Sequence, residues 1–172
     1  LRAKHADDLA LIDDVLLMFR NQKFFYTLEP PLLGEHPVDD FLFDTRTGFC
    51  EHYAPAFTVL MRGAGIPARV VTGYHGGDLN AFGNYLIVRQ AEAHAWTEVW
   101  VQGRGWIRVD PTSWVSPLRV DSGLSASVPS NESLPLLVRD DLDFLRQLRL
   151  SWDYMANAWN QWVLGYTPER QR

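Results

Sequence analysis

The sequence is poor in cysteine, in basic residues and in long apolar runs. Its single cysteine, Cys50, excludes a disulfide within the chain and a cysteine-rich metal site. The 16 Lys and Arg against 21 Asp and Glu leave a net charge of -5, which argues against nucleic acid as a partner. No apolar run reaches about 18 residues, and no segment has a signal-peptide pattern. Because the chain begins with Leu1 rather than Met, we expect a piece of a longer protein.

Hydrophobic residues make up 47% of the chain, enough for one folded domain with an appended segment. Apolar residues at helical spacing predict helices over 6–19 and 51–63. Alternating patterns between turn residues predict strands over 69–73, 85–88, 94–101 and 106–110. A Gly-containing turn at 103–105 should join the last two strands as an antiparallel hairpin. We therefore predict an α+β fold, with loops over 45–48, 76–84 and 113–133.

A helical seam near the C-terminus is rich in tryptophan. It consists of Leu145, Leu148, Trp152, Met155, Trp159 and Trp162. We expect a folded domain over residues 1–135 and a C-terminal helix over 136–172 that docks on it. The alternative is a helix at a membrane surface, because tryptophan favours that boundary.

Cys50 follows Thr47-Gly48-Phe49 and directly precedes the second predicted helix. The unpaired N–H groups and the dipole of a helix start stabilise a thiolate, the reactive form of cysteine. A buried cysteine that only packs under the helix start is the alternative.

Two residues of the predicted hairpin are candidate partners for this thiol. His94 begins the first strand, where a general base is held more rigidly than on a loop. Asp110 ends the second strand, so the hairpin should bring its carboxylate opposite the imidazole. A carboxylate in that position fixes the imidazole tautomer and stabilises the imidazolium, as in catalytic triads.

Three sequence blocks resemble those of bacterial transglutaminase-like proteins, in the order that this family has. They are Thr47–Ala54 with Met61–Tyr74, His94–Trp100 and Gly105–Thr112. The flanks, Phe25–Pro31 and Val38–Phe43, resemble those of multi-pass inner-membrane proteins of Gram-negative bacteria that carry a periplasmic domain of this family. The resemblance implies a papain-like fold, in which a cysteine-bearing helix packs on an antiparallel sheet between extra N- and C-terminal helices. It also implies Cys50 as nucleophile, His94 as general base and acid, and Asp110 as the orienting residue.

The function that this resemblance implies is acyl transfer of the protein-glutamine gamma-glutamyltransferase type, through a thioester, on protein or peptide substrates in the periplasm. A cysteine peptidase or amidase acting on peptides or cell-wall material is one alternative, and a non-catalytic peptide-binding module is another. Peptidoglycan-linked peptides are among the expected partners. Membrane attachment would come through flanking helices outside this chain, and we favour a monomer for the isolated domain.

Two features of related enzymes have no obvious counterpart. No tryptophan precedes Cys50 and Gln22 is the only glutamine upstream, so no side chain is assigned as oxyanion donor, and the backbone N–H of Cys50 is a partial substitute. Asp78 and Asn80 are too few ligands for a calcium loop. We expect no cofactor and no metal.

Overall fold

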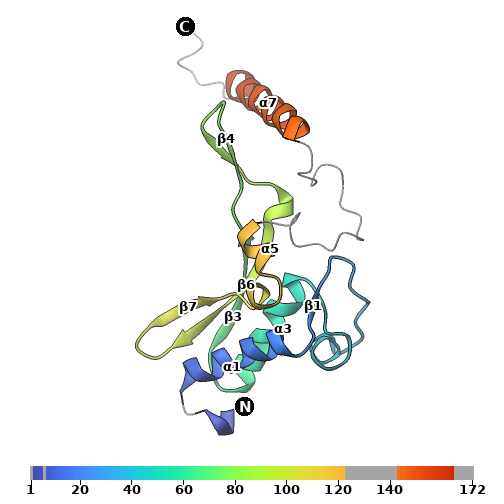
Figure 1. Cartoon of the computed structure of the whole chain (residues 1–172). Coiled ribbons are helices and arrows are strands. Elements are labelled where there is room, and N and C mark those ends of the chain that lie inside the picture. The colour runs from blue at the N-terminus through green and yellow to red at the C-terminus, as the bar shows by residue number, and fades with distance from the viewer. Residues whose placement is uncertain (1, 6, 123–142, 165–172) are drawn as a thin grey trace.

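The computed structural model describes residues 2–5, 7–122 and 143–164 (Figure 1). After a short turn at η1 (Arg2–Lys4), helix α1 (Asp8–Asn21) begins where the Asp7 side chain accepts a hydrogen bond from the Ala10 N–H at 3.2 Å. One face of α1 is buried, in agreement with the predicted helical spacing. Its buried residues are Leu11, Ile12, Val15, Leu16 and Phe19.

Helix α3 (Cys50–Gly63) packs on an antiparallel sheet of three strands in the order β3-β6-β7. These strands are β3 (Ala68–Tyr74), β6 (Ala93–Val101) and β7 (Gly105–Val109). Buried hydroxyls join helix and sheet, because Thr97 donates to the Ala54 carbonyl at 3.0 Å and lies 3.1 Å from the Thr58 hydroxyl. The predicted α+β fold, with its cysteine-bearing helix on an antiparallel sheet, is therefore confirmed.

A short parallel pair of strands leads into α3. Strand β1 (Phe25–Tyr26) pairs with β2 (Thr47–Gly48), and the Tyr53 hydroxyl donates to the Phe25 carbonyl at 2.9 Å. The prediction of a loop over 45–48 was wrong for residues 47 and 48. Two residues form too short a strand to leave an alternating pattern. Between β1 and β2 the chain forms α2 (Pro37–Asp39) and a π-helical turn, η2 (Asp40–Thr45).

A second hairpin lies apart from the main sheet. Strand β4 (Asp78–Asn80) pairs with β5 (Tyr85–Ile87), so the prediction of a loop over 76–84 was wrong at 78–80. The segment is rich in polar residues and glycines and has no apolar alternation that would predict a strand. Its backbone pairing does not depend on an apolar face.

The C-terminal helix lies beside this hairpin (Figure 1). It comprises α7 (Asp143–Trp159) and a π-helical turn, η5 (Asn160–Leu164). Asn80 donates to the Leu150 carbonyl at 2.8 Å, and Arg89 binds Asp153 at 2.6 Å. Five residues of the tryptophan seam are exposed, namely Leu148, Trp152, Met155, Trp159 and Trp162, and Trp152 is 68% exposed. No described helix is long and apolar enough to cross a membrane. The boundary predicted at residue 135 lies outside the described residues.

Two short helices follow β7, where we predicted a surface connection over 113–133. They are α4 (Thr112–Val115) and α5 (Pro117–Ser122). The prediction was wrong for residues 113–115 and 117–122, and the connection beyond residue 122 lies outside the described residues. A short η3 turn (Gln90–Glu92) precedes β6. The side chain of Arg119 on α5 is only 2% exposed and lies next to this turn, so this segment belongs to the folded core.

Candidate active site

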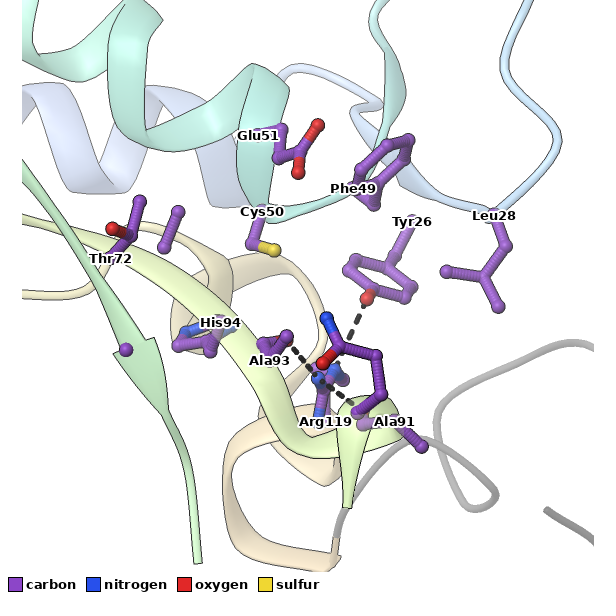
Figure 2. Close-up of a pocket in the computed structure, with 13 residues that line it drawn as sticks. Tyr26, Leu28, Phe49, Cys50, Glu51, Thr72, Ala91, Ala93, His94 and Arg119 are labelled. Atoms are coloured by element: carbon purple, nitrogen blue, oxygen red, sulfur yellow. Dashed lines mark hydrogen bonds between the residues drawn. The ribbon is translucent and has the colours of Figure 1, made fainter. Parts of the chain in front are cut away.

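Cys50 is the first residue of α3 and lies at the edge of a pocket (Figure 2). The residue is 6% exposed and packs on Ala54 and Ala95. Gly48, the last residue of β2, lies two residues before Cys50. A Cβ at this position would lie 2.6 Å from Cγ of His52. A glycine is therefore needed at this approach. The thiol is at the helix start, as predicted, where N–H groups lack helical acceptors.

His94 and Asp110 are in direct contact. The Nε2 atom of His94 lies 2.7 Å from Oδ2 of Asp110, and their side chains are 1% and 9% exposed. The other carboxylate oxygen of Asp110 accepts the Thr112 N–H at 3.2 Å. The predicted neighbourhood is thus present, but the register differs. Thr97 pairs with Val109, so the two residues are diagonal rather than opposite, and their side chains bridge the offset.

The second nitrogen of His94 faces a different environment. Nδ1 is fully buried and makes no hydrogen bond of ordinary geometry within the described residues. The Cys50 thiol is nevertheless close enough that hydrogen bonding to it helps to raise the His94 pKa. A loose contact of this kind is common in sites without substrate. The imidazole is therefore bonded to the carboxylate through Nε2 and also lies near the thiol.

Charge and burial compete at this histidine. Burial is the largest influence and opposes the imidazolium, but the hydrogen bonds and charges of Asp110 and Cys50 outweigh it and raise the His94 pKa to about 9. Burial also opposes ionisation of Asp110, yet the hydrogen bond and charge of His94, followed by Arg108, hold the pKa of that carboxyl below its usual value. The site therefore favours an imidazolium–carboxylate pair at neutral pH.

The pocket beside Cys50 has a volume of about 250 Å³. The polar side chains that line it and were not singled out from the sequence include Tyr26, Gln90 and Arg119. Tyr26 comes from β1, Gln90 from η3 and Arg119 from α5, so these residues meet only in the folded chain. The flanking motif that contains Tyr26 was the only signal that pointed to any of them.

The other described histidines lie outside the Cys50–His94–Asp110 group. His5 pairs with Asp14 at 2.8 Å, and His36 is exposed next to α2. His52 packs against aromatic rings, including Phe49. The ring centroid of His75 is 5.5 Å from that of His94, which makes it a neighbour of the site.

Comparison with known proteins assigns a family to this arrangement. The model of the transglutaminase-like superfamily matches residues 3–111. The chain belongs to this superfamily. A protein-glutamine gamma-glutamyltransferase of Pseudomonas aeruginosa is 48% identical over 178 residues, which cover 99% of this chain and 26% of that protein. The chain thus spans about a quarter of this relative.

Two crystal structures of the periplasmic domain of TgpA from Pseudomonas aeruginosa share the fold. One is 54% identical with a TM-score of 0.71 and covers 74% of this chain and 44% of that chain. The other, bound to ethylmercury, is 55% identical with a TM-score of 0.68 and covers 69% and 43%. The predicted family and the predicted periplasmic location are therefore confirmed.

Proposed function

We propose that this chain is the catalytic part of a protein-glutamine gamma-glutamyltransferase. Cys50 would be its nucleophile, His94 its general base and acid, and Asp110 the residue that orients the imidazole. The observation that carries this proposal is the arrangement at His94: Nε2 lies 2.7 Å from Asp110, Nδ1 is buried, and the nearby Cys50 thiol helps to raise the His94 pKa. The 48% identity to a relative with this activity in its name supports the choice of reaction.

In the first half-reaction the Cys50 thiolate attacks the carboxamide carbon of a glutamine side chain. The C–S bond forms as the carbonyl π electrons move to oxygen, giving a tetrahedral intermediate. The His94 imidazolium then gives its Nδ1 proton to the amide nitrogen, the C–N bond breaks, and ammonia leaves a thioester on Cys50. Asp110 stabilises the imidazolium before this transfer, in keeping with the raised His94 pKa.

In the second half-reaction an amine attacks the thioester carbon. The neutral imidazole of His94 accepts a proton from the attacking nitrogen as the new C–N bond forms. Collapse of the second intermediate breaks the C–S bond and returns the thiolate and imidazolium. Water in place of the amine would give glutamate, so the two outcomes are distinguished by their products.

The proposed substrates are periplasmic proteins and peptides, including peptides linked to peptidoglycan. In the full-length protein, membrane segments flanking this chain would anchor the domain at the inner membrane. The isolated domain should act as a monomer, because each residue of the proposed triad comes from one chain.

The test is amine incorporation into a glutamine-bearing peptide, measured by mass spectrometry. Loss of ammonia with gain of the amine is expected for the unaltered chain, and Cys50→Ala should abolish it. His94→Ala should do the same, whereas the matched variant His36→Ala changes an exposed histidine that does not line the pocket and should retain activity. Equal incorporation by the unaltered chain and Cys50→Ala would sink the proposal, and glutamate without amine adduct would identify a hydrolase.

Mercury binding offers a second test. One solved relative was bound to ethylmercury, and organomercurials react with thiolates. Cys50 is the only thiol of this chain, so one equivalent of ethylmercury should abolish transfer. An excess of dithiothreitol should restore it. Full activity with Cys50 occupied would contradict the role given to this residue.

A further inference from the structure

The proposed reaction places negative charge on the substrate oxygen in both tetrahedral intermediates. Cys50 occupies the first helical position, so its backbone N–H can donate one hydrogen bond to this oxygen. One donor leaves the charge half satisfied in a buried pocket, and the sequence offers no tryptophan or nearby glutamine upstream. A second donor should therefore come from the pocket lining.

We propose that the Tyr26 hydroxyl is this second donor, and that Arg119 positions it. This inference rests on the proposed function, because an oxyanion forms only if Cys50 attacks an acyl carbon.

The location of Tyr26 fits this role. Strand β1 pairs Tyr26 with Gly48, two residues before the nucleophile, so the ring is fixed relative to the start of α3. Tyr26 is 8% exposed and lines the same pocket as Cys50 and His94. Figure 2 shows Tyr26 on one side of the Cys50 sulfur and His94 on the other. An acyl group bound at the sulfur would thus meet the proton carrier on one side and the phenol on the other.

The hydroxyl of Tyr26 has a proton to give. The Nε atom of Arg119 donates to this oxygen at 3.3 Å, so the oxygen already acts as an acceptor. Within the described residues, no acceptor takes the phenol proton itself. The bond from Arg119 also withdraws electron density from the oxygen, which makes the phenol a better donor.

Tyr26 also stays neutral through the working pH range. Burial is the main cause that raises its pKa to about 12, opposed by the charge of Arg119 and assisted by those of Cys50 and Asp110. A neutral phenol donates a hydrogen bond, whereas a phenolate would repel the oxyanion. The influence of Cys50 on Tyr26 also shows that the two groups are near one another.

Arg119 is held on several sides, so it can keep the phenol in place. Its Nη2 atom donates to the carbonyls of Ala91 at 3.2 Å and Ala93 at 3.0 Å, both in the pocket lining. Glu92 lies 3.9 Å from Nη1. The guanidinium therefore ties η3, the start of β6 and β1 together around the pocket, which makes Arg119 a positioning residue.

The test is Tyr26→Phe, which removes the hydroxyl and keeps the ring. Two reactions of Cys50 are compared, namely acylation by p-nitrophenyl acetate and alkylation by iodoacetamide. Acylation passes through an oxyanion, whereas alkylation displaces iodide from a saturated carbon and forms none. We expect acylation to fall about 100-fold, the typical effect of losing one oxyanion donor, while alkylation changes less than about 2-fold.

Tyr53→Phe is the matched control. This tyrosine is also buried, but its hydroxyl donates to the Phe25 carbonyl and serves the fold. It should leave the ratio of acylation to alkylation unchanged. Equal losses of both reactions in Tyr26→Phe would show a purely structural role and overturn the inference, as would unchanged acylation.

Two further comparisons keep the outcome decisive. If Tyr26→Phe does not fold, Tyr26→Gln and Tyr26→Met are compared. The two side chains have similar length, but only that of glutamine can donate a hydrogen bond. Equal acylation rates of the two variants would overturn the inference. An unaltered chain that is alkylated but forms no acyl-enzyme refutes the proposed function, and with it this role for Tyr26. Acylation that depends on Tyr26 without amine transfer refutes the transferase alone.

Discussion

Replacing Asp110 by Asn tests how the site keeps a proton on His94. In the folded chain, burial opposes this proton, while the hydrogen bond and charge of Asp110, together with Cys50, raise the His94 pKa to about 9. The asparagine side chain preserves the shape but removes the charge and weakens the hydrogen bond. Burial, which lowers the pKa of His94, is then opposed only by Cys50. We therefore expect this pKa to return to its ordinary value of 6.5 or below.

The size of the effect follows from this shift. A fall from about 9 to about 6.5 removes about 3 kcal/mol of imidazolium stabilisation, at about 1.4 kcal/mol per pKa unit. At pH 7.5 the protonated fraction of His94 should fall from about 97% to about 9%. Because the imidazolium stabilises the thiolate and protonates the leaving group, turnover at pH 7.5 should fall at least about 10-fold.

Two measurements follow the proton directly. NMR of labelled histidine, with His94→Gln to assign the resonance, gives the pKa in each variant. The rate of Cys50 alkylation against pH shows whether thiol reactivity follows it. Glu98→Gln is the matched control. It removes a carboxylate that belongs to the same sheet but pairs with Arg69, at 2.7 Å, instead of His94. An Asp110→Asn chain whose His94 still titrates near pH 9 would refute the electrostatic role of Asp110.

Three further predictions concern stability. The pKa of His94 is about 9 in the folded chain and 6.5 as its ordinary value, so the folded state keeps the His94 proton over this pH range and the unfolded state loses it. The stabilisation that this proton gives to the folded state is therefore full below pH 6.5 and is lost as the pH rises to 9. Urea midpoints should show this decline, and His94→Gln should remove it. Thr97→Val deletes two buried hydrogen bonds and should cost about 1–3 kcal/mol in urea unfolding. Gly48→Ala places a Cβ against His52 and should lower the melting temperature and Cys50 alkylation, whereas Gly63→Ala, with open space around its Cβ, should lower neither.

The fold was predictable where the pattern of apolar residues is long. The helix of residues 8–21, the helix of 50–63 and the hairpin of 93–109 each bury one face, and each was predicted nearly in full. Strand β4 and helix α5 were missed because their formation depends on the rest of the fold. Strand β4 has only three residues, and its stability comes from backbone pairing with β5. The burial of Arg119 depends on segments more than 20 residues away.

The site was predictable to a different extent. Cys50, His94 and Asp110 each lie in a local motif, so the sequence blocks pointed to them, and the contact between the last two is present at 2.7 Å. The direct cross-strand pairing was wrong because Thr97 pairs with Val109, so Asp110 is two residues short of the position opposite His94. Tyr26 and Arg119 are 93 positions apart in sequence, and no short-range pattern joins them. Polar contacts at such separations come from tertiary packing, which spacing alone does not encode.

The relative placement of nucleophile and base depends on a contact inside the core. Ala54 is one turn beyond Cys50 on α3, and Thr97 is three residues beyond His94 on β6. The 3.0 Å hydrogen bond from Thr97 to the Ala54 carbonyl therefore fixes the register of helix against strand beside the pocket. Apolar side chains alone pack in several nearby registers at similar cost, whereas a buried hydroxyl is satisfied in few of them. A polar contact in the core thus selects the register that places the thiol beside the imidazole.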